Sequence, residues 1–142
     1  MSKYNAQKCN CDGYSFDSKD EMGYYEYLKT LRSKEMILNF ELQPKYTLLE
    51  KFKYMGKSRQ AMTYTPDFLI YHIDGTRELI DVKGMETQQG NMRRKLFEHK
   101  YQDLKLVWIA SNYKYGDING WITCEELKKK RAAAAKLKKA MK

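Results

Sequence analysis

The feature of this sequence that most restricts its fold is Asp74-Gly75, which separates two segments rich in apolar residues. An Asp-Gly pair between apolar runs is a strong signal for a tight β-hairpin turn. The pattern therefore predicts one strand over residues 63–73 and a returning strand over residues 78–83. A hairpin fixes which residues of its two strands lie opposite each other.

Two aspartates are placed symmetrically about this turn. Asp67 lies seven residues before Asp74 and Asp81 lies seven residues after it, so their carboxylates are expected to meet at the open end of the hairpin. Lys83 follows Asp81 by two residues and is expected on the same face, because side chains alternate along a strand. The hairpin thus predicts a cluster of two acids and one amine.

Two carboxylates that meet beside apolar residues repel each other, and a cation between them offsets that cost. Carboxylate oxygens with partial solvation favour Mg²⁺ or Mn²⁺. Such an ion lowers the pKa of a bound water, while Lys83 would orient or deprotonate the attacking water or stabilise the developing negative charge. The chemistry that uses this set is hydrolysis of a phosphodiester bond.

The patterns on either side of the hairpin predict a mixed α/β domain. Asp17 or Ser18 can cap a helix, and Glu21 three residues after Ser18 completes a capping-box pattern, so a helix is expected from there to about Ser33. Thr123 with Glu126 marks the start of a helix that continues into the Lys/Ala-rich C-terminus. We expect an α/β fold with an α+β-like mixed sheet, in the order helix, three strands, helix, strand, with an N-terminal hairpin and a C-terminal basic helix. The other expected elements are a hairpin at residues 4–16, strands at 37–43, 46–52 and 104–110, a basic loop at 53–60, and a helix at 88–101 whose Met92, Leu96 and Tyr101 face inward.

The residues Pro66-Asp67 and Asp81-Val82-Lys83, on a hairpin that follows a helix, resemble the motif of the PD-(D/E)xK nuclease superfamily. The separation of 14 residues between the two aspartates is typical of a short hairpin in that group. The resemblance implies a restriction-endonuclease-like core, whose element order is the one expected above. It also implies a metal site formed by the two aspartates, the backbone carbonyl of Val82 and an acid on the first helix.

Glu21 is the candidate for that helical acid, as a metal ligand and catalytic residue. It shares a helix face with Tyr24, Tyr25 and Leu28, and an acid on an apolar stripe needs a reason. The alternative is that Glu21 only serves the helix N-terminus, through the capping box and the helix dipole. The hairpin motif that Glu21 is expected to face favours the catalytic interpretation.

Most of the chain between residues 3 and 110 further resembles a family of small phage-encoded endonucleases, often labelled Holliday-junction-resolvase-like. This resemblance implies a Mg²⁺-dependent or Mn²⁺-dependent endonuclease acting on DNA, branched DNA such as four-way junctions above all, in phage replication, recombination or packaging. The sequence has no Gly-x-x-x-x-Gly-Lys phosphate loop, so no nucleotide cofactor is expected. Symmetric cutting of a junction takes two active sites, so a homodimer is expected. The matching segments are Lys-Tyr-Asn-Ala near the start, Asp12-Gly, Phe16-Asp-Ser-Lys-x-Glu21, Gln43-Pro, Tyr64-x-Pro-Asp67-Phe, Asp81-Val-Lys83-Gly, Thr87 and Arg93-x-Lys95-Leu-Phe.

Other functions stay open at this point. A sequence-specific or nonspecific duplex nuclease would use the same residues, and a nucleic-acid-binding module could keep the fold without the chemistry. No apolar run approaches the ~20 residues that span a membrane, and three cysteines, an odd and small number, fit a reducing compartment. We therefore expect a cytoplasmic protein, in the host cytoplasm if it is phage-encoded. Cys9-x-Cys11 lacks the spacing and partners of a structural zinc site and is expected on one face of a short strand.

Positive charge gathers at the C-terminus. Residues 128–142 contain eight Lys or Arg and no acid, so subtracting eight from the net charge of +9 leaves about +1 for residues 1–127. We expect a nuclease domain over 1–127 and a basic helical tail over 128–142 that contacts phosphates. The residues expected to contact nucleic acid are Gln43, Lys53, Tyr54, Lys57, Arg59, Arg93, Lys95, Lys128, Lys129, Lys130 and Arg131.

Overall fold

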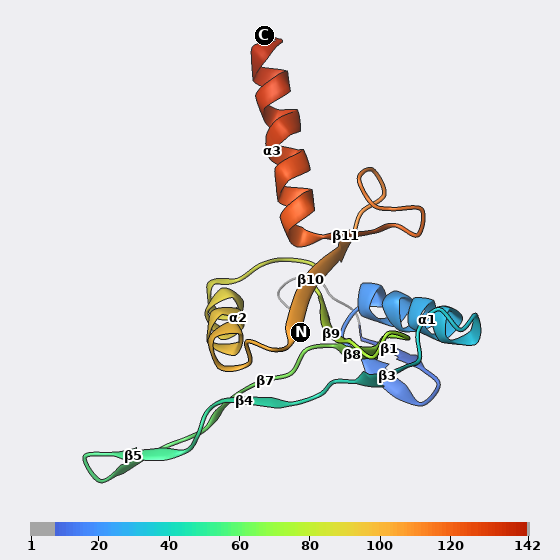
Figure 1. Ribbon diagram of the computed structural model, residues 1–142. Helices are drawn as coiled ribbons and strands as arrows, with labels where there is room; N and C mark the ends of the chain where they lie inside the picture. Colours follow the sequence, from blue (N-terminus) through green and yellow to red (C-terminus); the bar gives the residue numbers. More distant parts are fainter. Residues whose placement is uncertain (1–7, 142) are drawn as a thin grey trace. The chain divides into compact units, whose positions relative to one another are not determined.

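A computed structural model describes residues 8–141. It has three helices and a mixed five-stranded sheet in the order β11-β10-β9-β8-β3, so the expected mixed α/β fold is confirmed (Figure 1). Among the described residues, no helix has the length and apolar character to cross a membrane. The elements are β1 (Cys9–Cys11), β2 (Tyr14–Phe16), α1 (Lys19–Ser33), β3 (Asn39–Leu42), β4 (Tyr46–Leu49), β5 (Phe52–Tyr54), β6 (Lys57–Arg59), β7 (Met62–Tyr64), β8 (Phe68–Tyr71), β9 (Arg77–Val82), α2 (Gln88–Lys100), β10 (Lys105–Ser111), β11 (Trp121–Thr123) and α3 (Cys124–Ala140).

The chain divides into two compact units. One unit comprises Met1–Lys29, Val82–Gly84 and Val107–Lys142, and the other comprises Thr30–Asp81 and Met85–Leu106. The first contains the N-terminal hairpin and the C-terminal helix. The second contains the hairpin on which the two aspartates lie.

In the first unit, both helix starts agree with the sequence. The Ser18 hydroxyl accepts a hydrogen bond from the Glu21 N–H at 3.1 Å, and the Thr123 hydroxyl accepts one from the Glu126 N–H at 3.1 Å. Each bond satisfies a backbone donor that lacks a partner in the first turn of a helix. In α3 only Cys124 and Leu127 are buried, and every described residue from 128 onward is exposed. The basic end of α3 therefore contributes charge to the surface and nothing to the core.

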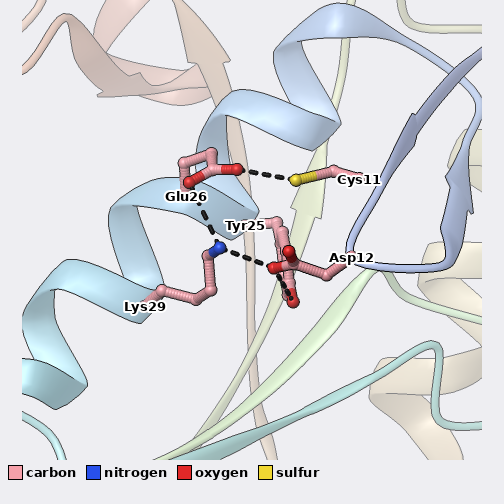
Figure 2. Close-up of polar contacts among 5 residues, drawn as sticks. All are labelled: Cys11, Asp12, Tyr25, Glu26 and Lys29. Atoms are coloured by element: carbon pink, nitrogen blue, oxygen red, sulfur yellow. Dashed lines mark hydrogen bonds and ion pairs between the residues drawn. The ribbon is translucent and has the colours of Figure 1, made fainter.

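The β1–β2 hairpin is attached to α1 by a polar cluster (Figure 2). Lys29 lies between Asp12 and Glu26, with ion pairs of 2.6 and 3.4 Å, and the Tyr25 hydroxyl donates to Asp12 at 2.9 Å. Burial, with this bond to Asp12, raises the pKa of Tyr25 to about 12. The Cys11 thiol donates to Glu26 at 2.7 Å, and this bond raises the pKa of the thiol. Cys11 is thereby held as a protonated, poorly nucleophilic thiol in a structural contact.

The second unit is built around Phe97 of α2, which is fully buried. The rings of Tyr46, Tyr64 and Tyr101 surround it with centroid distances of 5.0–5.6 Å. The prediction that Met92 and Leu96 face inward was wrong, since their side chains are 59% and 37% exposed. The buried face of α2 instead follows residues 93, 97 and 101, which are spaced by four. The aromatic rings at 97 and 101 bury more apolar area than Met92 and Leu96 would.

The expected strand over residues 63–73 is split at Pro66. Its first part, β7, pairs with β4, whereas its second part, β8, pairs with β3 and β9. Proline lacks an N–H donor and restricts the residue before it, so the ladder cannot run through this position. Two segments that read as one strand therefore belong to different sheets.

The expected loop over residues 53–60 is also different, because it forms a hairpin of β5 and β6. Met55 and Gly56 at its tip have φ of 48° and 78°, the left-handed backbone that a tight hairpin turn requires. The pairing of β4 with β7 shifts by one residue between Thr47 and Leu49, and the shifted register continues unchanged through β5 and β6. The four strands therefore form one long two-stranded ribbon with a bulge, which Figure 1 shows extending from β4 and β7 to β5. We call its end, residues 51–60, the finger.

Candidate acidic site on the hairpin

The two motif aspartates lie at facing positions of neighbouring strands. The register of β8 and β9 pairs Phe68 with Ile80. Asp67 directly precedes β8, and continuing this register by one step places it opposite Asp81. Side chains that are directly opposite in an antiparallel pair share a face of the sheet and lie about 5 Å apart at their Cβ atoms. The predicted hairpin is thus confirmed. Its continued register sets the two acids in one row, and the meeting of their carboxylates stays a prediction.

Gln43 continues this row on the other side of Asp67. Its backbone N–H donates to the carbonyl oxygen of Asp67 at 2.9 Å. Gln43 has a φ of 49°, a left-handed conformation that costs a residue other than glycine about 1–2 kcal/mol. The side chain of Gln43 is exposed, and its expected contact with nucleic acid stays a prediction.

Tyr64 holds Asp81 from the ribbon. Its hydroxyl donates to Oδ2 of Asp81 at 2.5 Å, and both side chains are buried, with 6% and 5% exposure. The Tyr64 ring packs edge-on against Phe97 at 5.6 Å. Residue 64 was not among the predicted site residues. One signal could have pointed to Tyr64. A tyrosine that is buried beside the motif needs a hydrogen-bond partner for its hydroxyl.

Arg93 of α2 contacts the backbone of β7. Its Nη1 donates to the backbone carbonyl of Thr63 at 2.6 Å, which anchors the strand carrying Tyr64. Lys95 is exposed on the outer face of the helix. The DNA contacts proposed for Arg93 and Lys95 stay predictions.

Three further predicted site residues belong to the other compact unit: Glu21, Val82 and Lys83. Lys83 follows directly after β9, its N–H donates to the Ile109 carbonyl at 2.8 Å, and its Nζ lies 4.8 Å from the centre of the Trp108 ring. That ring restricts the lysine side chain through a cation–π contact. The shared face expected for Lys83 and Asp81, and the part expected of the Val82 carbonyl, stay predictions.

Glu21 is 4% exposed at the start of α1. Its carboxylate accepts a hydrogen bond from the Asp17 N–H at 3.3 Å, while its own N–H donates to Ser18. The bond to Ser18 is one half of a capping box, whereas the carboxylate bonds the residue before Ser18. Its proposed approach to the two aspartates stays a prediction.

The donors in the acidic row suit one kind of metal ion. Within residues 8–141, no group of three or more His, Cys, Asp or Glu side chains is arranged to hold a metal. Asp67 and Asp81 offer hard carboxylate oxygens on facing strands, and one of these carboxylates is oriented by a tyrosine. Mg²⁺ keeps several waters and is commonly bound by one or two carboxylates plus phosphate oxygens of the substrate. The row therefore fits a hydrated Mg²⁺ or Mn²⁺ and does not fit a structural zinc ion.

These features define an α/β protein with a carboxylate pair at the open end of a hairpin and a basic helix at its C-terminus. The chain belongs to the family described as protein of unknown function (DUF1064), which matches residues 1–117. No curated protein and no solved structure matches the chain. The family description names no activity, so an activity must be proposed from the residues themselves.

Proposed function

We propose that this protein is a metal-dependent nuclease that hydrolyses phosphodiester bonds in DNA, with branched DNA such as four-way junctions as its main substrate. The observation that carries the proposal is the register that sets Asp67 opposite Asp81 on the hairpin. A buried carboxylate beside a second one is costly without a cation, and a divalent ion with open positions is what phosphodiester hydrolysis needs.

Each residue of the site has a part in this proposal. Asp67 and Asp81 would hold Mg²⁺ or Mn²⁺, with Glu21 and the Val82 carbonyl as the further ligands that the resemblance implies. The ion, when bound, supplies a water of lowered pKa and neutralises charge on the phosphate. The ammonium of Lys83 would donate a hydrogen bond to a phosphate oxygen or to the attacking water. The exposed amide of Gln43 would position the same water or a phosphate.

Positive charge on two exposed segments supports a polyanionic substrate. The exposed basic end of α3 and the exposed finger both carry lysine and arginine without acids. Phosphate contacts from such residues supply most of the affinity for DNA without reading its sequence. A junction cut symmetrically in two strands requires two sites, so we propose that the active form is a homodimer.

Cleavage of a substrate panel tests the proposal directly. Labelled four-way junction, linear duplex and single strand are incubated with the protein in Mg²⁺, Mn²⁺ or EDTA. We expect cleavage of the junction with either ion and none in EDTA, because the carboxylate pair cannot activate water alone. Failure to cut all three DNAs with both ions would remove the enzyme proposal, and junction binding without cleavage would favour a non-catalytic binding module.

Tyr64→Phe tests how the acidic site is oriented. Loss of the hydroxyl frees the Asp81 carboxylate to rotate, and outer partners of metal ligands typically contribute about 10- to 100-fold to metal affinity or activity. We expect cleavage to fall by about that factor and the Mg²⁺ concentration for half-maximal rate to rise.

Tyr101→Phe is the matched control for this variant. It removes a hydroxyl from the same aromatic cluster, where it donates to the Thr47 carbonyl at 2.8 Å, without touching Asp81. We expect its metal dependence to equal that of the wild type. An equal rise in both variants would mean that Tyr64 acts only through packing.

A further inference from the structure

We infer that the finger is a stacking platform for an unpaired nucleic-acid strand. This role is distinct from the binding of phosphates alone. The inference rests on the proposed function only in taking nucleic acid as the partner. It names a substrate feature, unpaired bases, that the acidic site does not specify.

The finger has no part in the protein core. Every residue from 49 to 61 is exposed, including Phe52 at 43% and Tyr54 at 58%. An isolated two-stranded hairpin is marginally stable and gains little by exposing large rings. The rings therefore have no structural reason within the described chain to be where they are.

The register of the hairpin sorts its side chains onto two faces. Phe52 is opposite Arg59, and Tyr54 is opposite Lys57. Directly opposite residues share a face, so two rings and two cations lie on one side of the finger. Lys53, paired with Ser58, lies on the other.

This face matches the chemistry of an unpaired strand. Phe52 and Tyr54 are two residues apart, about 6.7 Å along the strand. That is twice the ~3.4 Å rise between stacked bases, so one base fits between the rings. The paired cations can contact the phosphates on either side. Base–aromatic stacking with a positive groove is how proteins hold single strands without reading sequence, whereas bases stacked inside a duplex offer no free face.

The charge of the finger decides between nucleic acid and a second protein copy as its partner. Residues 51–60 contain four Lys or Arg and no acid. Two such faces would repel each other, while a phosphate backbone would attract both. We therefore commit to an unpaired DNA strand as the occupant.

Binding measurements with the full chain test this inference without relying on cleavage. The double variant Phe52→Leu/Tyr54→Leu keeps apolar side chains on the finger but removes both rings. By fluorescence anisotropy in EDTA, with labelled oligo-dT and a duplex of equal length, we expect oligo-dT binding at least about tenfold weaker, as loss of base stacking predicts. We expect duplex binding to change less than about twofold, since phosphate contacts carry it.

The control variant is Tyr113→Leu, which removes a fully exposed ring outside the finger and should alter neither affinity.

As a second readout, tryptophan introduced by Phe52→Trp should lose fluorescence on adding oligo-dT and keep it on adding duplex. Unchanged oligo-dT affinity, an equal loss for both DNAs, or a dimer that dissociates in the double variant would each overturn the inference. If oligo-dT binding depends on the rings but the protein cuts no DNA, the inference holds and the nuclease proposal fails. If the protein cuts DNA but binding does not depend on the rings, the nuclease proposal holds and the inference fails.

Discussion

We expect Asp81→Asn to lower DNA cleavage by more than about 100-fold. Changing an outer partner of a metal ligand costs up to about 100-fold, and changing a ligand itself should cost more. Asparagine keeps the size of the side chain and an oxygen that still accepts the Tyr64 hydroxyl, so the fold is retained. The substitution removes the negative charge that a divalent ion needs. Junction binding should be as tight as in the wild type or tighter, because one charge that repels phosphates is gone.

The hairpin itself supplies the control. Asp74 lies in the turn of the same hairpin, where its Oδ1 accepts from the N–H and hydroxyl of Thr76 at 2.9 and 2.6 Å. Asp74→Asn keeps an oxygen for these bonds and removes a charge outside the acidic row. Its cleavage rate should stay within about twofold of the wild type, as expected for a surface change away from the chemistry. A fully active Asp81→Asn protein would refute the site.

Deleting residues 128–142 should weaken DNA binding and flatten its dependence on salt. Each phosphate neutralised contributes about 0.9 to the slope of log affinity against log salt, so eight lost charges would reduce the slope by up to about 7. The deletion leaves Cys124 and Leu127, the buried residues of α3, in place. The measurement is a titration of labelled junction between about 50 and 200 mM salt.

A second form of the tail separates charge from length. Replacing its Lys and Arg residues by Gln keeps a good helix former at each position and removes the charge. We expect this variant to behave like the deletion in binding and like the wild type in thermal unfolding. A salt slope unchanged in both variants would show that the tail does not contact DNA.

Local signals in the sequence predicted much of this structure. The Asp74-Gly75 turn, the capping residues Ser18 and Thr123, and the register that faces Asp67 with Asp81 all depend on neighbouring residues or on a short hairpin. Each is an interaction that a few residues determine by themselves. The family match over residues 1–117 adds membership without adding an activity.

The remaining features depend on contacts between distant segments. Tyr64 meets Asp81 only because the chain splits at Pro66 and sends β7 into the ribbon. Phe97 is preferred over Leu96 because rings from β4 and β7 gather there with Tyr101, which caps the same helix. Residues 57–60 lack apolar alternation, so the sequence predicts a loop over 53–60 where the structure has the hairpin of β5 and β6. No local pattern reveals such choices, since they are made by the packing of the whole unit.

The one-residue bulge between Thr47 and Leu49 has a consequence for how this ribbon can vary in length. Successive side chains on a strand point to opposite sides, so removing a single residue there would turn Phe52 and Tyr54 to the reverse side of the hairpin. Adding or removing residues in pairs, one from each strand at the tip, would change the reach while preserving the orientation near the base. Relatives with longer or shorter ribbons should therefore differ by even numbers of residues.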